Sequence, residues 1–424
     1  MSEIKKVCII SGKRIPFMRS STKYMGKPLR ELMKPAMDAL VKELNLEGRE
    51  IGEAAFGAVN KHAYDFALAR EIVMDSALSP TTPATDMQKA CGTSLETIVM
   101  LGNKIALGQI DSAIAGGVDT NSDVPIEFKK SFSDRLLKLA AAKTLGAKLK
   151  CLAGFNPKEM MPKLPAIKEP RTGLSMGESC EVMAKDWGIT REAQDELAFE
   201  SQKKAALAYA DGFYDDMVVD FMGTKKDGII RETKMEKLSK LRPAFDKKSG
   251  KGTLTAANST ALTDGASCVF LCSEEYAKEN NLTPMAYLTY AQSAAVNYVN
   301  DEGLLMAPAY AVPKLLKQAG LSLQDFDFYE IHEAFAAQVL CTLEAWKSEE
   351  FCKEKLGLGS ALGEIDFNKL NVKGGSLALG HPFAATGARI VAGLSKMLHE
   401  KGSGRGLISI CTAGGMGVTA IIEK

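Results

Sequence analysis

Net charge, long apolar runs and histidine are all scarce in this chain of 424 residues. Its 53 basic and 52 acidic side chains give a formal net charge of +1, so no overall positive field favours nucleic acid as a partner. No stretch reaches the ~18 apolar residues expected of a membrane-spanning helix. The four histidines are few enough that any in an unusual local setting becomes a candidate for chemistry.

The nine cysteines contain no Cys-x-x-Cys pair and no regular spacing. This pattern argues against a disulfide framework and a structural zinc site, and it favours a reducing compartment. The N-terminal stretch enters an apolar strand that Lys13 and Arg14 soon interrupt, which is too short for a secretory signal. We therefore expect a cytoplasmic protein.

Strand and helix patterns alternate along the chain. Val7–Ile10 is a short apolar strand, and apolar residues at a helical period predict a helix over Leu29–Leu44. Another helix should follow Cys91. Its buried side is expected to hold Leu95, Ile98, Val99, Leu101 and Ile105. The alternation predicts an α/β architecture in which helices cover sheets, and the length suggests two or three domains.

The two ends of the chain share a short pattern. In the first half a helix from Gly92 leads to a strand at Ser112–Ala115, which Gly116-Gly117 should end. In the second half a helix at Thr386–Leu398 leads to a strand at Gly406–Cys411 and then to a second Ala-Gly-Gly. This repeated order of helix, strand and Ala-Gly-Gly favours two duplicated halves.

Residues 122–255 differ from both halves, since they are rich in charge and irregular in pattern. Within them, Phe128–Lys150 combines basic and apolar side chains, which predicts a basic amphipathic helix or helical hairpin. Such a segment is either a solvated surface helix or a contact with anionic lipid, an acidic partner chain or a phosphorylated ligand. The four prolines of Gly154–Pro170 predict an extended connector after it.

Two of the four histidines lie in unusual surroundings. His381 follows a glycine-rich run and precedes a proline, which describes a tight loop, and Thr386 can cap the next helix. A loop histidine on a rigid scaffold is a good catalytic candidate. His332 lies where a predicted strand runs into a helix. His62 and His399 stand beside ordinary charged residues and are expected at the surface.

Cys91 stands directly before a predicted helix. The positive end of a helix dipole favours a thiolate, and the thiolate is the nucleophilic form of cysteine. A nearby imidazole would complete its activation. The alternative is a buried structural cysteine, which is the usual fate of a lone one. The residues around Cys91 leave both interpretations open.

Cys411 ends a predicted strand and opens a glycine-rich loop, Cys411–Gly417. Glycines allow a backbone to approach a ligand closely and to present N–H groups to it. The alternative is a strand-end cysteine before a turn. The remaining cysteines lack such a loop, and we interpret them as structural: Cys8, Cys151, Cys180, Cys268, Cys272, Cys341 and Cys352.

Five segments, taken together and in order, resemble the thiolase family. The segments are Ala90-Cys91-Gly92, Leu241–Phe245 with Gly252–Ala256, His332–Gln338, Asn371–Gly375 through Gly380-His381-Pro382, and Cys411–Gly417. The resemblance runs nearly end to end, starting from Arg14–Phe17. Each motif alone is weak, but five at the family's spacing are specific.

The resemblance implies a role for each of these residues. Cys91 would attack the substrate and hold the acyl group, His381 would accept its proton, and Cys411 would carry the proton of the α-carbon. The backbone N–H groups of Cys91 and Ala413 would form one oxyanion hole, and His381 with His332 would form the other. The resemblance implies no metal and no bound cofactor, because CoA is a substrate.

At one position the chain departs from the commonest thiolase pattern. Many family members have Asn where this chain has His332. Histidine here, with Phe383 after His381-Pro382 and with Ala413 where others have Gly, resembles the fatty-acid-oxidation branch, which includes β-subunits of a multienzyme complex. The departure leaves the protonation state of His332 open and favours degradative use.

The resemblance also implies where substrate binds. Met176, Met306 and Phe335 would line the acyl pocket, although ordinary core packing is an equal alternative for the methionines. The family's CoA contacts fall on Arg231, Ala256 and Thr260. A helix over Arg191–Ala210 would belong to the loop domain that covers CoA.

For the fold, the resemblance implies five layers, α-β-α-β-α, built from two duplicated halves. The expected domains are residues 1–285, with a loop domain at about 122–255 inserted, and residues 286–424. The expected partners are CoA thioesters, further copies in a homodimer or homotetramer, and an α-subunit or membrane surface bound through Phe128–Lys150.

Three other functions remain as alternatives. A biosynthetic acetoacetyl-CoA thiolase would use the same residues. A decarboxylating 3-oxoacyl synthase would use Cys91 with both histidines, but it leaves Cys411 without a role. A CoA or lipid carrier without catalysis would need none of these side chains.

Overall fold

The structure is a computed structural model that describes residues 4–163, 168–300 and 302–424. Its strands are β1 (Val7–Arg14), β2 (Met18–Arg19), β3 (Glu53–Phe56), β4 (Ala84–Asp86), β5 (Ser112–Asp119), β6 (Glu127–Phe128), β7 (Pro162–Lys163), β8 (Thr263–Ser273), β9 (Ala286–Ala295), β10 (Phe328–Ile331), β11 (Arg405–Thr412) and β12 (Met416–Glu423). Its helices are α1 (Leu29–Glu43), α2 (Leu68–Asp75), α3 (Thr93–Ala106), α4 (Lys130–Ala141), α5 (Leu145–Leu152), α6 (Met176–Asp186), α7 (Arg191–Ala210), α8 (Met235–Leu238), α9 (Glu274–Glu279), α10 (Ala307–Ala319), α11 (Ala336–Lys347), α12 (Glu349–Glu354), α13 (Ser376–Leu379) and α14 (Thr386–Lys401).

The sheet consists of two half-sheets with the same pattern of pairing. The described strands are hydrogen-bonded in the order β10-β11-β12-β9-β1-β8-β5-β3-β4, with β2 beside β8. In the first half β3–β5 is parallel, and β5–β8 and β8–β1 are antiparallel. In the second half β10–β11 is parallel, and β11–β12 and β12–β9 are antiparallel. The repeated pattern confirms the predicted duplication.

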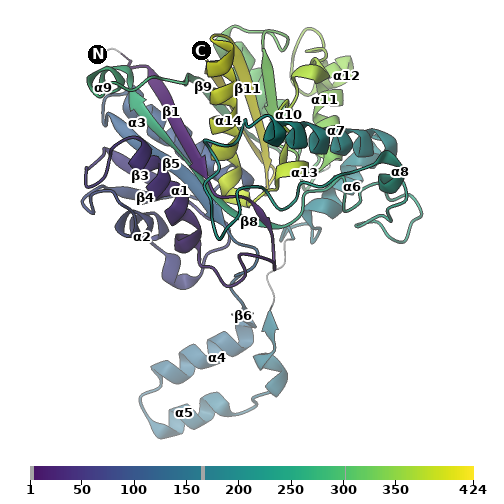
Figure 1. The fold of residues 1–424 in the computed structure, drawn as a ribbon. Helices are drawn as coiled ribbons and strands as arrows, with labels where there is room; N and C mark the ends of the chain where they lie inside the picture. The colour runs from purple at the N-terminus through teal and green to yellow at the C-terminus, as the bar shows by residue number, and fades with distance from the viewer. Residues whose placement is uncertain (1–3, 164–167, 301) are drawn as a thin grey trace.

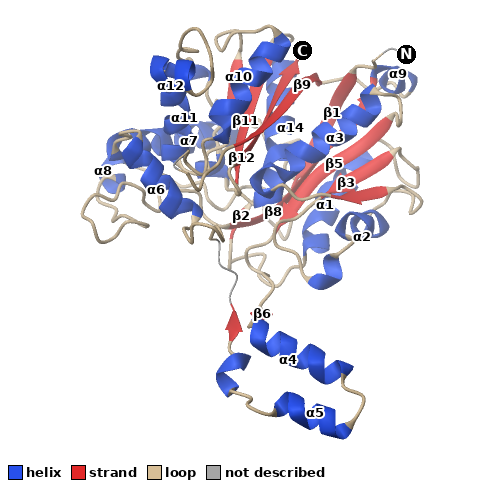
Figure 2. Cartoon of the chain, turned by 180° about the vertical axis from the view of Figure 1, so that it is seen from behind, coloured by secondary structure: helices blue, strands red, loops and turns tan. Residues whose placement is uncertain are grey.

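The half-sheets meet at a short seam where β1 pairs with β9, from Val7↔Leu288 to Ile9↔Ala286. Helices α3 and α14 pack against each other and against strands of both halves, while α1 covers the first half from outside and α10 the second (Figure 1 and Figure 2). The order is therefore helix, sheet, helix, sheet, helix. This is the expected five-layered arrangement, with its two sheets continuous through the seam.

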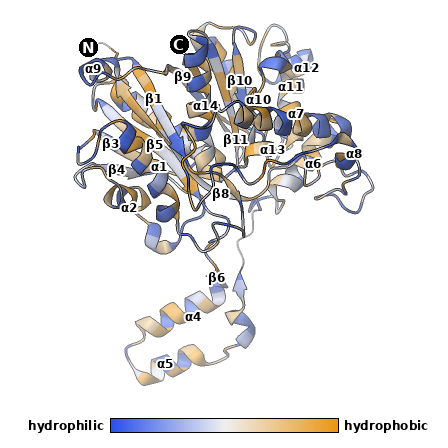
Figure 3. Ribbon diagram, viewed as in Figure 1, coloured by the Kyte–Doolittle hydropathy of each residue, from blue (hydrophilic) through white to orange (hydrophobic). Residues whose placement is uncertain are grey.

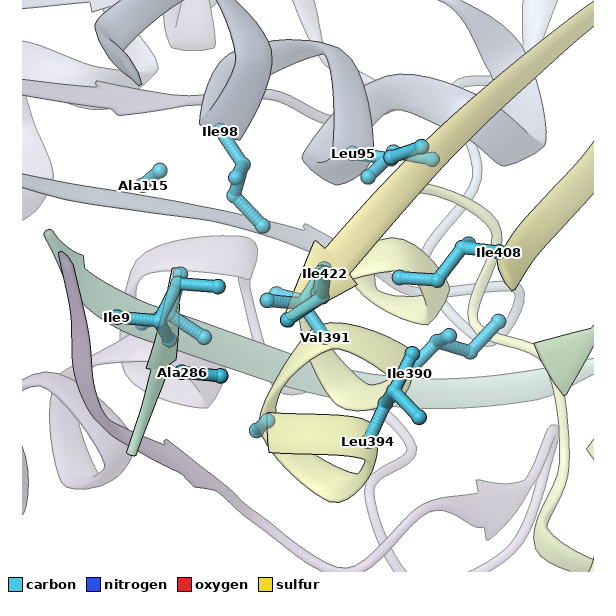
Figure 4. Packing of buried hydrophobic residues seen from close by; sticks show 14 of the residues in the cluster. Ile9, Leu95, Ile98, Ala115, Ala286, Ile390, Val391, Leu394, Ile408 and Ile422 are labelled. Carbon is cyan, nitrogen blue, oxygen red and sulfur yellow. The ribbon is translucent and has the colours of Figure 1, made fainter. Parts of the chain in front are cut away.

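The central layer is held by apolar side chains from both helices and both half-sheets (Figure 4). Those labelled in Figure 4 are Ile9, Leu95, Ile98, Ala115, Ala286, Ile390, Val391, Leu394, Ile408 and Ile422. Close contact between the helices requires a glycine, because a Cβ on Gly387 would lie 2.4 Å from the backbone nitrogen of Leu95. Burying each large side chain contributes about 1.5–3 kcal/mol.

The predicted helices agree with the structure more closely than one predicted strand does. Helix α7 has the predicted bounds, and α1 ends one residue before the predicted end. Val99, expected on the buried side of α3, is half-buried. The prediction that Gly116-Gly117 ends a strand is wrong, because β5 continues to Asp119.

Packing explains the two glycines within β5. A Cβ on Gly117 would lie 2.1 Å from the carbonyl oxygen of Ala384, and one on Gly116 would lie 2.4 Å from the carbonyl oxygen of Ser267. Glycine here permits close backbone approach within a continuous strand. By contrast, Gly414 and Gly415 have φ angles of 78° and 69° and form the turn between β11 and β12.

The segment Phe128–Lys150 forms the predicted helical hairpin, α4 followed by α5, which projects from the body (Figure 1). Every residue of the two helices is exposed or half-buried, and Figure 3 shows hydrophobic and hydrophilic residues alternating along them. Arg135 of α4 donates to the carbonyl oxygens of Cys151, at 2.6 Å, and Ala153, at 3.1 Å. The short pair β6–β7 connects the hairpin to the body.

The predicted connector Gly154–Pro170 contains a short 3-10 turn, Pro157–Met160, and strand β7, while residues 164–167 lie outside the described residues. None of the helices in the described residues is long and apolar enough to cross a membrane.

Candidate active site

Cys91 lies in a 3-10 turn, Ala90–Gly92, directly before α3. Ala90 has a φ of 46°, a left-handed conformation that costs a non-glycine residue on the order of 1–3 kcal/mol. The Thr93 hydroxyl holds the turn, because it accepts from the Lys89 N–H at 2.8 Å and donates to the Ala90 carbonyl at 2.7 Å. The strained turn presents the sulfur at the end of the helix.

The two candidate histidines reach the same place from different elements. His332 follows β10, and its N–H donates to the carbonyl of Ser409 in β11 at 2.8 Å. His381 follows Gly380, whose φ is 97°, and its N–H donates to the hydroxyl of Thr263 at 2.7 Å. The two imidazole ring centroids lie 4.1 Å apart.

Cys91, His332 and His381 converge on one point. Each offers one donor atom, and the three atoms lie within 4.8 Å of one another. The Nε2 atoms of both histidines are buried and have no hydrogen-bond partner among the described residues. Sulfur and imidazole nitrogen are also ligands of zinc, so a soft divalent ion would fit these donors.

Cys411 completes the group from the end of β11 and is 1% exposed. Burial raises the pKa of its thiol well above the usual value, and the neighbouring Cys91 raises that pKa further. In the loop that follows, the Gly414 N–H donates to the Glu169 carboxylate at 2.8 Å. Glu169 therefore fastens the glycine-rich loop to the chain before α6.

Burial dominates the electrostatics of the site. It raises the pKa of Cys91 to about 12, while the backbone N–H groups of Ala413 and Cys91 act to lower it. Burial and the nearby Arg389 lower the pKa of His381 to about 3. Burial, His381 and Arg389 hold the pKa of His332 well below its usual value.

These shifts act against the thiolate that the helix dipole favours at Cys91, although that side chain is only partly buried. The cost of burying a charge opposes the dipole and favours a neutral thiol and two neutral imidazoles in the resting site. The thiol can become nucleophilic only as its proton leaves.

The Nδ1 atom of each histidine lies within hydrogen-bonding distance of a hydroxyl oxygen. Nδ1 of His332 lies 2.8 Å from the Ser376 Oγ, and Nδ1 of His381 lies 2.6 Å from the Thr386 Oγ1. The prediction that Thr386 caps α14 is therefore wrong. Ala385 occupies the N-cap position without a side-chain bond, and the Thr386 hydroxyl faces His381 instead.

The residues expected to line the acyl pocket lie together. Met306 and Phe335 are buried in one apolar cluster with Cys411, and the partly buried Met176 packs against that cluster. All three expected pocket residues therefore lie in, or pack against, the apolar cluster that contains Cys411.

The expected CoA contacts lie nearer the surface. Thr260 donates through its N–H and hydroxyl to the Ala334 carbonyl, at 3.0 and 3.1 Å, and Ala256 is exposed. Arg231 is also exposed, and its N–H donates to Gln202 at 3.1 Å. The structure gives no polar contact between the Arg231 guanidinium and the described residues.

Several residues that support the site were absent from the prediction. Asp119 accepts N–H bonds from Val59, Asn60 and Ala384, and so fixes the loop after His381. Glu333 accepts from the Ser201 hydroxyl, the Asn371 side chain and the Leu377 N–H. Glu333 lies just after the strand that precedes His332 and could have signalled this role, whereas Asp119 lies beyond the predicted end of its strand.

The remaining cysteines and histidines lie where expected, with one small difference. Cys8, Cys180, Cys268, Cys272, Cys341 and Cys352 are buried, and Cys151 is partly buried. His399 is exposed. His62 is half-buried, with Nε2 3.2 Å from Asp123, and it stacks on Tyr64.

Two family models account for almost the whole chain. The model described as "Thiolase, N-terminal domain" matches residues 7–275, and "Thiolase, C-terminal domain" matches residues 282–424. The chain belongs to the thiolase family. The resemblance noted in the sequence is thereby confirmed.

This thiolase is similar to curated relatives over its full length. A 3-ketoacyl-CoA thiolase of Pectobacterium carotovorum subsp. carotovorum is 42% identical over 425 residues, covering 99% of this chain and 96% of its own. A 3-ketoacyl-CoA thiolase of Photobacterium profundum is 41% identical over 426 residues, covering 99% and 97%.

Solved structures agree on the fold. Bacillus anthracis acetyl-CoA acetyltransferase superposes with a TM-score of 0.81 at 28% identity, covering 100% of both chains. Human mitochondrial 3-ketoacyl-CoA thiolase in complex with CoA gives 0.82 at 26% identity, again over 100% of both chains.

Proposed function

We propose that this thiolase is an acyltransferase that cleaves 3-oxoacyl-CoA with CoA, giving acyl-CoA and acetyl-CoA, in fatty-acid β-oxidation. The observation that carries this proposal is the convergence of Cys91, His332 and His381 beside the buried Cys411. The relatives named 3-ketoacyl-CoA thiolase support it.

In the first half-reaction Cys91 attacks C3 of the substrate while Nε2 of His381 takes the thiol proton. Because the resting thiol is neutral, attack and proton transfer occur together. The C2–C3 bond then breaks and its electrons pass to C2, which takes a proton from Cys411. Acetyl-CoA leaves, and the acyl group remains on Cys91.

In the second half-reaction CoA removes the acyl group. The CoA thiol gives its proton to the Cys411 thiolate and attacks the acyl-Cys91 thioester. The Cys91 sulfur leaves and recovers its proton from His381, so both cysteines return to their starting state.

Each half-reaction develops negative charge on an oxygen. We assign the oxygen on C3 to the backbone N–H groups of Cys91 and Ala413, both of which lower the pKa of the Cys91 sulfur. We assign the thioester oxygen of the acetyl-CoA enolate to His332 and His381. Their unpartnered Nε2 atoms are free to meet it.

Met176, Met306 and Phe335 would receive the acyl chain, since they share an apolar cluster with Cys411. Thr260 and Ala256 would contact the CoA arm, and Arg231 would meet its phosphates. CoA acts as a substrate, and the chemistry above requires no other group.

The test is an assay of 3-oxoacyl-CoA substrates of increasing chain length, with and without CoA. We expect repeated turnover of 3-oxoacyl-CoA only when CoA is present, and loss of no more than one equivalent per active site without it. Turnover confined to acetoacetyl-CoA would favour the biosynthetic alternative. Consumption of malonyl-CoA with release of carbon dioxide would favour the decarboxylating synthase, and absence of any turnover would favour a carrier.

We further propose a homodimer or homotetramer in the cytoplasm, with domains at residues 1–285 and 286–424 and a loop domain at about 122–255. Strand β4 supports self-association because it is the last strand of the sheet and all its residues are half-buried. An open sheet edge is a ready pairing site for another strand. Sedimentation of the wild type and of Thr85→Pro in β4 would test this.

For the α4–α5 hairpin we propose contact with an α-subunit of a β-oxidation complex or with a membrane surface. Four leucines support this because their side chains are exposed beside lysines: Leu136, Leu137, Leu145 and Leu149. Co-sedimentation with vesicles of anionic lipid would distinguish the membrane from a protein partner.

A further inference from the structure

Three buried polar groups, Arg389 of α14, Ser376 and His332, form a hydrogen-bonded network. Nη2 of Arg389 donates to the Ser376 Oγ at 2.8 Å, and that oxygen lies 2.8 Å from Nδ1 of His332. Arg389 is 5% exposed, Ser376 0% and His332 1%. Neither Ser376 nor Arg389 has a place in the reaction steps described above.

The chemistry of these groups fixes the direction of both hydrogen bonds. A guanidinium can only donate, so the Ser376 oxygen accepts from Arg389. The serine proton then needs an acceptor, and Nδ1 of His332 is the one acceptor the described residues offer it. If Nδ1 carried the proton instead, the Ser376 oxygen would accept twice and its own buried proton would stay unpaired, which is costly.

His381 has a hydroxyl partner but no charged donor behind it. Its Nδ1 meets the Thr386 hydroxyl, and the described residues offer that hydroxyl no second hydrogen bond. Thr386 is 0% exposed, so its own proton would also stay unpaired if the hydroxyl accepted from Nδ1. The form of His381 that leaves Nε2 unprotonated, as a base for Cys91 must, therefore costs one unpaired hydroxyl proton, but no charged donor competes for the Thr386 oxygen.

We propose that Ser376 and Arg389 are positioning residues that hold His332 in the neutral tautomer with its proton on Nε2. His332 then donates into the site, while His381 accepts the Cys91 proton in the reaction proposed above. The charged donor behind Ser376, which Thr386 lacks, distinguishes two histidines that otherwise face the same sulfur. This inference rests on the proposed function, in which His332 supplies a donor to the enolate oxygen.

The residues around Arg389 hold this hydrogen-bonded network in place. Burial lowers the pKa of Arg389, while Glu330 and Glu333, in their ionised forms, act to raise it. A Cβ on Gly375 would lie 2.1 Å from the Glu333 carboxyl carbon, so glycine before Ser376 lets α13 pack against the loop that carries His332. The three groups are thus fixed by elements from three parts of the chain.

The direct test is nitrogen NMR of the free enzyme with ¹⁵N-labelled histidine, which needs no substrate. The chain has four histidines, and His62→Gln and His399→Gln remove the other two signals that are not in the site. We expect His332 to show a protonated Nε2 and an accepting Nδ1, and Ser376→Ala to mix the two tautomers. The matched control is Ser395→Ala in α14, which removes a buried hydroxyl that has no hydrogen-bond partner among the described residues.

Kinetics provide the second arm. Ser376→Ala and Arg389→Met should lower kcat about 10- to 100-fold, less than the 10²–10³ lost with an oxyanion donor itself, and change KM less than about twofold. Arg389→Lys keeps a cationic donor and should recover most of the rate. Arg389→Met leaves the hydroxyl in place, so it tests the chain even if Ser376→Ala does not fold.

Two results would overturn the proposal. One is a His332 tautomer that stays unchanged in both Ser376→Ala and Arg389→Met. The other is a kcat no lower than that of Ser395→Ala. If the wild-type enzyme showed no thiolysis, the proposed function would be wrong. The NMR spectrum would still show which nitrogen of His332 carries the proton.

Discussion

Helices α14 and α4 both carry apolar and basic side chains, yet they lie in opposite surroundings. In α14, Leu394 is 0% exposed between the two half-sheets, whereas Leu137 of α4 is 67% exposed. The central layer also positions the reacting groups, since α3 follows Cys91 and α14 follows His381. The comparison teaches that an amphipathic pattern predicts a helix but does not reveal what covers its apolar face.

The largest effect on the reaction rate is expected at Cys91, the nucleophile that precedes helix α3 of the central layer. Cys91→Ser keeps the shape but replaces the sulfur with a poorer nucleophile, so thiolysis should fall about 10⁴-fold or more. Initial rates of 3-oxoacyl-CoA cleavage measure this. Cys151→Ser in the hairpin is the matched control, and equal losses in both variants would contradict the comparison.

Cys411→Ala should show that Cys411 and Cys91 have different roles in the reaction. Without its thiol the α-carbon has no proton donor, and the overall rate should fall about 10²- to 10⁴-fold. The variant should still take an acyl group onto Cys91 but lose exchange of the acetyl-CoA α-protons in deuterated water. Exchange at the wild-type rate would rule out the proton-carrying role.

Leu394→Ala should show what the central layer contributes to stability. Removing a fully buried leucine leaves a cavity and should lower the free energy of unfolding by about 2–5 kcal/mol. Denaturant unfolding measures the loss. A value below 1 kcal/mol would mean that the layer collapses around the missing side chain.

Glu330 in β10 should make stability depend on pH. Burial raises its pKa to about 8, while the unfolded chain releases the proton near ~4.3, so the native state binds more protons in between. The free energy of unfolding should therefore fall as pH rises from about 4 to 8, by up to ~1.4 kcal/mol per pH unit.

Glu330→Gln should flatten that decline, and the exposed Glu47→Gln should not. Unfolding midpoints measured at pH 5, 6, 7 and 8 would show it. Equal slopes for the wild type and Glu330→Gln would contradict the assignment.

The smallest effect should come from the hairpin. Leu137→Ala removes a mostly exposed side chain, so the free energy of unfolding should change by less than ~0.5 kcal/mol and kcat should stay the same. The variant is the matched partner of Leu394→Ala. A loss as large as that of Leu394→Ala would mean that the hairpin packs on the body in solution.

Local patterns predicted much of this molecule. The helical period gave α1 and α3, and the loops around Cys91, His332, His381 and Cys411 were evident from glycines, a proline and strand ends. Each of these features depends on residues close together in the chain.

Long-range contacts account for what the sequence could not predict. Glu169 bonds to Gly414 across 245 positions, and Ser376 reaches His332 across 44. The pKa of Cys91 depends on burial by both halves, which no local pattern contains. Gly116 and Gly117 looked like a strand end because a close backbone contact and a turn both favour glycine.

The central claim is that Cys91 carries the acyl group. Incubating the enzyme with a 3-oxoacyl-CoA in the absence of CoA, followed by digestion and mass spectrometry, tests it directly. The expected result is the acyl mass on the peptide that contains Cys91 and no acylation of that peptide in Cys91→Ser. Acyl mass on another residue, or none on any peptide while acetyl-CoA is released, would contradict the account.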